Sequence, residues 1–199
     1  MLIAAAPLPG YQEPYGLLCA ILQDGTNAWR WELDQDLSED AVVWQPSPWS
    51  AARGGGSVSA ANSGGGLRSC PGRHSIGAVI LHIAAVEVFW FERFALGQPP
   101  DSEERKLLMA DETDVDEWSW HVPPRRPISW YFEMHDRIRA RTLESIKKWP
   151  PADTAIERDG EPRTMRWVLG HVIQHEAYHL GQAVLLNRLW HLRESGEQG

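Results

Sequence analysis

The chain has 199 residues, 43% of them hydrophobic, which is enough for one globular domain over 1–199 with a sizeable core. Its net charge of −8, from 27 acidic against 19 basic residues, excludes nucleic acid as an expected partner. The two cysteines, Cys19 and Cys70, lie too far apart in sequence for a Cys-x-x-Cys metal pair and are too few for a disulfide framework. No apolar run approaches the ~20 residues that cross a membrane, and no basic segment precedes the short apolar start. We therefore expect a cytoplasmic protein with no signal peptide and no membrane association.

The first predicted helix spans about residues 14–36, where apolar side chains recur at intervals of three and four. Ser38 follows it as a candidate N-cap for one further short turn of helix. Over residues 45–72 the composition shifts to Pro, Ser and Gly, including two runs of three glycines. Because this Gly-rich loop offers little apolar surface to bury, we predict a poorly structured connection without a function and with little effect on stability.

The second predicted helix spans about 75–96, with Ser75 as its N-cap and Gly97 as its stop. It is apolar on most sides, as a central bundle helix is, so His82 within it should face protein. A second long connection follows over 98–127, and its acidic run is most simply a solvated surface. Three aromatic residues of this connection are alternatively candidates to cover the mouth of a pocket, and they are Trp118, Trp120 and His121.

The third predicted helix spans about 128–149 and ends at two prolines. Its basic residues, Arg139 among them, are interpreted mainly as an exposed face, and His135 either approaches a site or is structural. An Asp-Gly turn within residues 158–164 indicates a small hairpin before a fourth helix over about 164–191. Four helices joined by two long crossover connections predict an all-α fold, a four-helix bundle.

Three histidines recur at intervals of four residues in the fourth predicted helix, at His171, His175 and His179. Residues four apart lie one above the other on a helix, so two successive imidazoles can bind one metal ion. The apolar stripe of this helix runs from Met165 to Leu189 and includes His175 and His179, which should therefore point into the core. His171 lies about 40° to one side of that line, at ~100° of rotation per residue, and is the weaker candidate ligand.

Two interpretations of the inward histidines are open at this point. Each ring is either a core residue bonded to a backbone carbonyl or a metal ligand, because an unsatisfied buried polar group is unfavourable by roughly 1 to 3 kcal/mol. His82 favours the metal, since sites in bundles are built from side chains on facing helices. Three neutral imidazoles suit zinc, nickel, copper or iron and leave a coordination position for water or substrate.

Two segments carry a family resemblance, namely residues 75–84, which contain His82, and residues 171–182, which end in His-x-Gly-Gln. Weaker support comes from residues 37–46 and from the Asp-Gly turn ahead of the fourth helix. The pattern resembles the DinB/YfiT-like superfamily of metal-binding four-helix bundles. The resemblance implies a homodimer and a divalent metal ion, zinc or nickel with iron or manganese as alternatives, held by His82, His175 and His179.

The resemblance also implies two classes of function. Characterised members include transferases and isomerases that use bacillithiol, mycothiol or glutathione, so the chain is expected to activate such a thiol, or water, for transfer to a small electrophilic substrate. The alternative is a non-catalytic metal-binding or stress-response bundle protein whose ion mainly fixes the fold. Candidate catalytic residues are Glu176 and His171. Glu176 is alternatively a surface or interhelical charge, and His171 is alternatively a capped surface residue. Glu176 and Gln182 are also candidates to hydrogen-bond the ligand rings.

Overall fold

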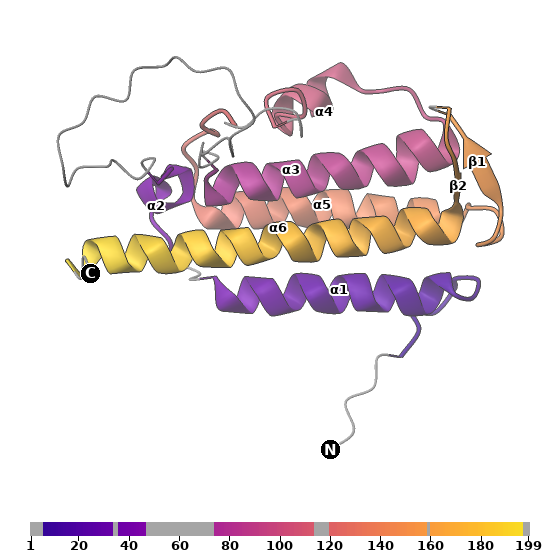
Figure 1. Ribbon diagram of the computed structural model, residues 1–199, viewed down its shortest axis with the longest axis horizontal. Helices are drawn as coiled ribbons and strands as arrows, with labels where there is room; N and C mark the ends of the chain where they lie inside the picture. The colour runs from indigo at the N-terminus through magenta and orange to yellow at the C-terminus, as the bar shows by residue number, and fades with distance from the viewer. Residues whose placement is uncertain (1–5, 34–35, 47–73, 114–119, 159, 197–199) are drawn as a thin grey trace, which may run out of the picture.

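Four long helices lie side by side in the computed structural model, which describes residues 6–33, 36–46, 74–113, 120–158 and 160–196 (Figure 1). The long helices are α1 (Tyr15–Glu32), α3 (Ile76–Val88), α5 (Ile128–Ile146) and α6 (Met165–Glu194). A π-helix, η1 (Phe89–Phe94), continues α3, and the connections contain the short helices α2 (Glu39–Val43) and α4 (Ser102–Leu107). Two strands, β1 (Ala155–Glu157) and β2 (Pro162–Thr164), pair as an antiparallel hairpin with Ala155 opposite Thr164. The predicted all-α bundle is confirmed.

α1 and α6 run in one direction and α3 and α5 in the opposite one (Figure 1). α6 packs against both α1 and α3, and α3 also packs against α5. Because α5 runs parallel to α3, the connection between them has to return along the bundle, which explains its length. The other long connection includes the Gly-rich loop predicted over 45–72, which lies outside the described residues except for 45–46. The antiparallel neighbours α3 and α6 are the pair that carries the predicted ligands.

Local signals fix the ends of several helices. Ser38 and Ser75 each accept a hydrogen bond from the backbone N–H three residues later, at 3.2 and 3.4 Å, so both predicted N-caps are confirmed. Thr164 caps α6 in the same way at 3.2 Å. Gly97, which follows η1, has a φ of 68°, a left-handed conformation that only glycine adopts without a steric penalty. The predicted stop of the second helix is thus confirmed.

Two helices end earlier than the periodicity indicates. α1 ends at Glu32 instead of near residue 36, because Leu33 adopts an extended backbone. α5 ends at Ile146 instead of near residue 149. Trp149 is instead buried against the bundle, where its Nε1 donates to the carbonyl of Phe91 at 3.2 Å. The burial of Trp149 therefore accompanies the earlier end of α5.

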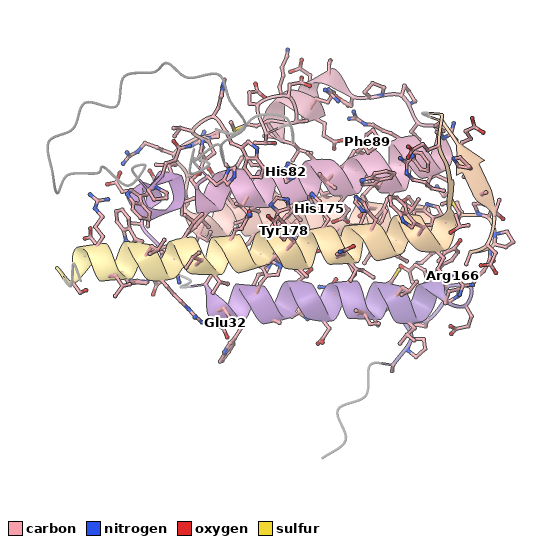
Figure 2. All side chains as sticks on the ribbon, in the orientation of Figure 1. Glu32, His82, Phe89, Arg166, His175 and Tyr178 are labelled. Carbon is pink, nitrogen blue, oxygen red and sulfur yellow. The ribbon has the colours of Figure 1, made fainter. Side chains whose placement is uncertain are left out.

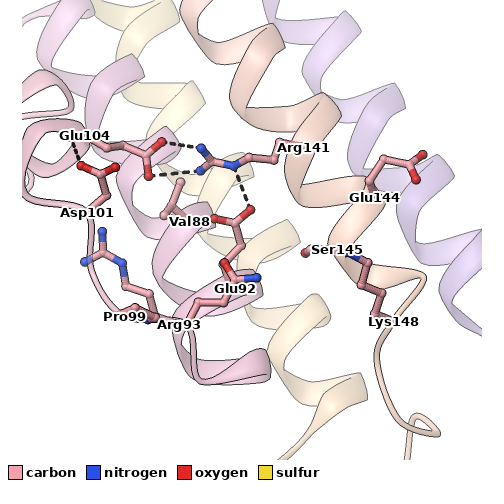
Figure 3. A pocket seen from close by; sticks show the side chains of 11 residues that line it. Val88, Glu92, Arg93, Pro99, Asp101, Glu104, Arg141, Glu144, Ser145 and Lys148 are labelled. Carbon is pink, nitrogen blue, oxygen red and sulfur yellow. Dashed lines mark hydrogen bonds and ion pairs between the residues drawn. The ribbon is translucent and has the colours of Figure 1, made fainter.

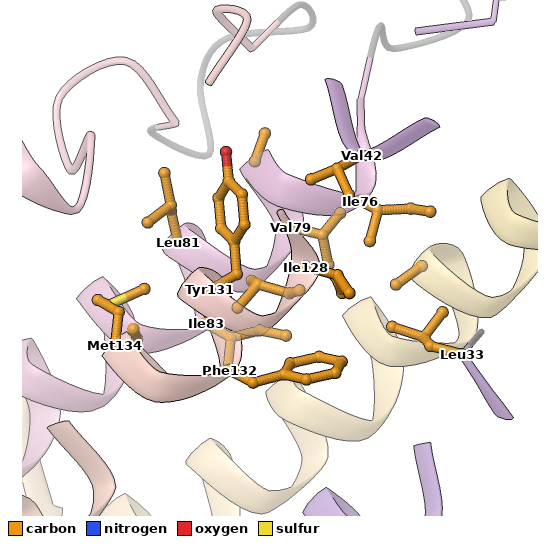
Figure 4. Close-up of a cluster of buried hydrophobic side chains, with 14 of the residues drawn as sticks. Leu33, Val42, Ile76, Val79, Leu81, Ile83, Ile128, Tyr131, Phe132 and Met134 are labelled. Carbon is orange, nitrogen blue, oxygen red and sulfur yellow. The ribbon is translucent and has the colours of Figure 1, made fainter. Parts of the chain in front are cut away.

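The buried hydrophobic side chains form two clusters, one toward each end of the bundle. Ile76, Val79 and Phe132 belong to the first, which is drawn in Figure 4. Phe91 and Trp149 belong to the second. Between the two clusters, four of the buried polar residues, one from each long helix, are joined by hydrogen bonds. These four residues, which we call the charged layer, are Thr26, Glu87, Arg139 and Glu176.

Arg139 is the centre of the charged layer. Its Nε donates to both carboxylate oxygens of Glu87 at 2.9 and 3.0 Å. Its two Nη atoms donate to Thr26 Oγ1 at 2.8 Å and to Glu176 Oε2 at 2.6 Å. The prediction of an exposed Arg139 is wrong, since only 3% of its surface is accessible. One buried guanidinium thus hydrogen-bonds to two buried carboxylates and balances one of their two negative charges, which are unfavourable in a core without such a partner.

His135 lies beside the charged layer and is fully buried. Its Nδ1 accepts a hydrogen bond from Arg30 at 2.8 Å. Its Nε2 is 4.0 Å from the carboxylate of Glu87, which Arg139 already binds. Burial, followed by the charges of Arg139 and Arg30, holds the pKa of His135 well below its ordinary value of 6.5. The ring is therefore neutral in the folded protein, and of the two predicted alternatives His135 is the structural residue.

We expect His135 to make the protein less stable in mild acid. Below about pH 6.5 the unfolded chain binds a proton at this residue and the folded chain does not, so the free energy of unfolding falls as the pH is lowered. In the His135→Gln variant the free energy of unfolding should change with pH less steeply, by up to about 1.4 kcal/mol per pH unit. Urea unfolding of metal-free protein at several pH values measures this slope. His121→Gln, at an exposed position, is the matched control. An unchanged pH slope in His135→Gln would contradict a neutral buried ring.

Candidate metal centre

Nitrogen atoms of three histidine rings converge between α3 and α6. His82 lies in the middle of α3, and His175 and His179 lie on successive turns of α6; the first two are labelled in Figure 2. One ring nitrogen from each histidine lies within 4.8 Å of the others, and Nε2 of His82 is 3.2 Å from Nε2 of His175. Among the described residues, this is the one group of three or more potential ligands placed so closely. The three predicted ligands are therefore brought together, and they could hold a metal ion.

Neighbouring groups orient two of the three rings. Nδ1 of His179 is 2.9 Å from Oε1 of Gln182, which lies one turn further along α6, as predicted from the stripe. The ring of His82 hydrogen-bonds to the backbone of Thr113, in the connection after α4. Imidazoles that bind metals commonly donate their other N–H to such an oxygen, which aims the free nitrogen at the ion. Sequence analysis missed Thr113, because no periodic pattern marks a backbone carbonyl in a connection.

The three rings are neutral at physiological pH. Burial, followed by the neighbouring imidazoles, lowers the pKa of His82 and of His175 to about 3. Burial also lowers the pKa of His179. Metal ligation requires deprotonated imidazoles, so no proton has to be displaced from these rings at pH 7. Three neutral nitrogen donors match the preferences of zinc, nickel and related divalent ions, so the chemistry of the donor set fits the metal that the resemblance implies.

Trp120 covers one side of the triad. Its ring centroid lies 4.4 Å from that of His82, and its side chain is nearly buried. Of the three aromatic residues considered as a pocket cover, Trp120 lies over the centre, His121 is exposed, and Trp118 is outside the described residues. His74, which sequence analysis missed, packs on the same indole with a centroid distance of 4.0 Å. Aromatic side chains therefore shield the rings from solvent on this side.

His171 lies at the rim of the centre and outside the triad. Its ring centroid is 6.0 Å from that of His175. It stacks on Trp167 at 4.7 Å with 8° between the ring planes, and Trp90 contacts it edge-on at 5.0 Å. This is the sideways position that the rotation along the helix predicts. His171 is therefore placed to meet a molecule in front of the triad.

Glu176 points away from the triad, although it is adjacent to His175 in sequence. Its Oε1 accepts hydrogen bonds from Thr26 at 2.6 Å and from Trp29 at 3.2 Å. Its Oε2 accepts from Arg139 at 2.6 Å. One residue along a helix is a rotation of ~100°, enough to carry a side chain to another face. The prediction that Glu176 contacts the ligand rings is wrong, and its carboxylate belongs to the charged layer.

A pocket of about 510 Å³ adjoins the triad. His82 and His175 line it, together with His171 at the rim. Phe89 and Trp90, the first two residues of η1, form part of its wall. π-Helical turns inside α-helices are frequent at functional sites, and sequence analysis did not predict this one. A small molecule therefore has room beside two of the three ring systems.

Comparisons with known sequences agree with this geometry. Within the described residues, no helix is both long and apolar enough to cross a membrane. No curated protein matches the sequence. The sequence profile of the DinB superfamily matches residues 31–183, well over half of the chain, and this range contains the triad, Gln182 and the whole pocket lining. The chain therefore belongs to the DinB superfamily.

Proposed function

We propose that this protein is a metal-dependent enzyme that activates a low-molecular-weight thiol, or water, for transfer to a small electrophilic substrate. The observation that carries the proposal is the convergence of His82, His175 and His179 beside a pocket of about 510 Å³. Structural metal sites are closed by four protein ligands, whereas catalytic sites keep a coordination position for water or substrate. Three ring nitrogens and an adjoining cavity match the second kind.

The residues of the chain orient the ligand rings and shield the site from water. A zinc or nickel ion held by the three rings would lower the pKa of a bound thiol or water toward neutrality. Gln182 and Thr113 hold the rings of His179 and His82 in place. Trp120 excludes water from one side, which strengthens electrostatic interactions within the site. These groups are therefore expected to affect metal affinity and turnover together.

Metal content and thiol consumption test the proposal. Protein purified without a histidine tag should contain about one equivalent of divalent metal per chain, measured by elemental mass spectrometry. The loaded protein should consume bacillithiol, mycothiol or glutathione in the presence of an electrophile such as a chlorinated aromatic compound. Chelator-treated protein is the control, and returning the metal should restore the activity. Loaded protein that neither binds nor consumes any of the three thiols would contradict the thiol-transferase role.

The second candidate function is a non-catalytic metal-binding protein. It is favoured by the low exposure of His82 and His179, at 3% and 8%, because an ion at that depth would join α3 to α6. In this case removal of the metal would lower the melting temperature, while the loaded protein would consume no thiol. Measuring both quantities on the same preparation therefore distinguishes the two candidates.

A further inference from the structure

The pocket beside the triad has a histidine end and an arginine end. His82 and Arg93 both line it, and they are eleven residues apart on the continuous helix formed by α3 and η1. At 1.5 Å per residue this is a separation of roughly 16 Å along the helix axis. Apolar side chains line the pocket between them, including Val86, Phe89 and Leu108. An elongated molecule can therefore contact the ring nitrogens with one end and the guanidinium with the other.

The charges that line this pocket are all positive. Arg93 and Arg105 are the two ionised side chains among its lining residues, and none of the described lining residues is acidic. Arg105 forms an ion pair with Asp111, so its charge is partly neutralised. Arg93 forms no ion pair within the described part of the chain. Burial, followed by the charge of Arg105, lowers the pKa of Arg93, while the charges of Glu104, Glu92 and Asp101 act in the opposite direction.

The three carboxylates that act electrostatically on Arg93 make hydrogen bonds to other groups. Figure 3 shows Glu92 and Glu104 directed at Arg141. Arg141 donates to Glu92 at 2.8 Å and to both oxygens of Glu104 at 2.6 and 3.1 Å. Asp101 accepts hydrogen bonds at 2.9 and 3.0 Å from the first backbone N–H groups of α4. These groups line a separate pocket of about 330 Å³, and Arg93 lines both this pocket and the pocket of the triad.

Arg93 belongs to the π-helix η1. A π-helical turn closes through i→i+5 hydrogen bonds, so it changes which side chains face a given side relative to an α-helix. Phe89, Trp90 and Arg93 of η1 all line the pocket of the triad.

We infer that the substrate or cosubstrate of this site carries a carboxylate, which Arg93 binds at the end of the pocket opposite the triad while the apolar wall holds the rest of the molecule. This inference rests on the proposed function for the role of the triad. A carboxylate fits because the planar guanidinium binds it through two parallel hydrogen bonds. A dianionic phosphate fits less well, because its second charge would have to be balanced by Arg105, which already pairs with Asp111.

Two matched pairs of small molecules test the inference. On metal-free protein, isothermal titration calorimetry compares hexanoate with hexanol. On metal-loaded protein it compares ω-mercaptohexanoate with ω-mercaptohexanol, which present the same thiol to the metal. In each pair the acid should bind about tenfold more tightly than the alcohol, the effect of one charge-assisted contact. Arg93→Met should abolish this preference without changing the affinity for either alcohol.

Two further variants separate charge from structure. Arg93→Lys keeps the charge and should keep most of the preference for the acids. Arg137→Met removes an exposed arginine from α5 and should change nothing. Equal affinity for acid and alcohol in the unmodified protein, absence of any hexanoate binding, or a preference that survives Arg93→Met would overturn the inference. If the preference for hexanoate holds while neither mercaptan binds the loaded protein more tightly than metal-free protein, the carboxylate site stands and the proposed thiol chemistry fails.

Discussion

The His179→Ala variant is expected to lose its metal ion completely at neutral pH, and His175→Ala is expected to do the same. Each change leaves two of the three converging ring nitrogens. Changes to groups that merely orient a ligand typically weaken metal affinity 10- to 100-fold, so loss of a ligand should weaken it by more than about 100-fold. Elemental analysis of dialysed protein measures the loss. The melting temperature should fall with it, because a metal ion that binds only the folded chain stabilises that chain, and this stabilisation is lost with the ion.

His171→Ala is the matched control, since it removes a third histidine from the same face of α6. Its ring lies 6.0 Å from that of His175 and packs on Trp167, so metal content and melting temperature should change little. Activity is the property that this variant should affect, because His171 lines the pocket. Loss of metal in His171→Ala together with its retention in His179→Ala would mean that His171 and His175 form the ligand pair, and would refute the triad.

The bundle and the triad could be predicted because both depend on local periodicity. A stripe that repeats every three or four residues indicates a helix and also indicates which side chains face inward, so His175 and His179 follow directly from their spacing. Ser38 and Ser75 could be predicted for a similar reason, since an N-cap hydrogen bond spans three residues. His82 required one further step, the rule that sites in bundles join facing helices.

The charged layer could not be predicted, because it depends on how four helices meet. Arg137, Arg139 and Arg141 look alike in sequence, yet only Arg139 of the three is buried. Its partners Glu87 and Glu176 lie 52 and 37 residues away, at distances that no periodic pattern encodes. The same limit applies to the π-helix and to the backbone of Thr113. Each of these features is a consequence of packing between segments that are distant in sequence.

Replacing Arg139 with Met is expected to destabilise the protein by roughly 3 to 5 kcal/mol. The change would leave the carboxylates of Glu87 and Glu176 in the core without a counter-charge, although Thr142, Thr26 and Trp29 still donate hydrogen bonds to them. A buried charge without a partner is far more unfavourable than the small change in packing when the arginine side chain is replaced by a methionine of similar shape. Urea unfolding of metal-free protein measures the difference without a contribution from metal binding.

Arg166→Met is the control, because Arg166 pairs with Asp153 at 2.8 Å and both side chains are exposed, at 55% and 84%. Water can solvate the carboxylate that it leaves behind, so the expected loss is less than about 1 kcal/mol. Changing Arg139, Glu87 and Glu176 together to Met should recover most of the stability lost in Arg139→Met, since apolar side chains can often replace a buried ionic network. Equal losses for the two arginines, or no recovery in the triple variant, would mean that unpaired buried charge is not the cause of the instability.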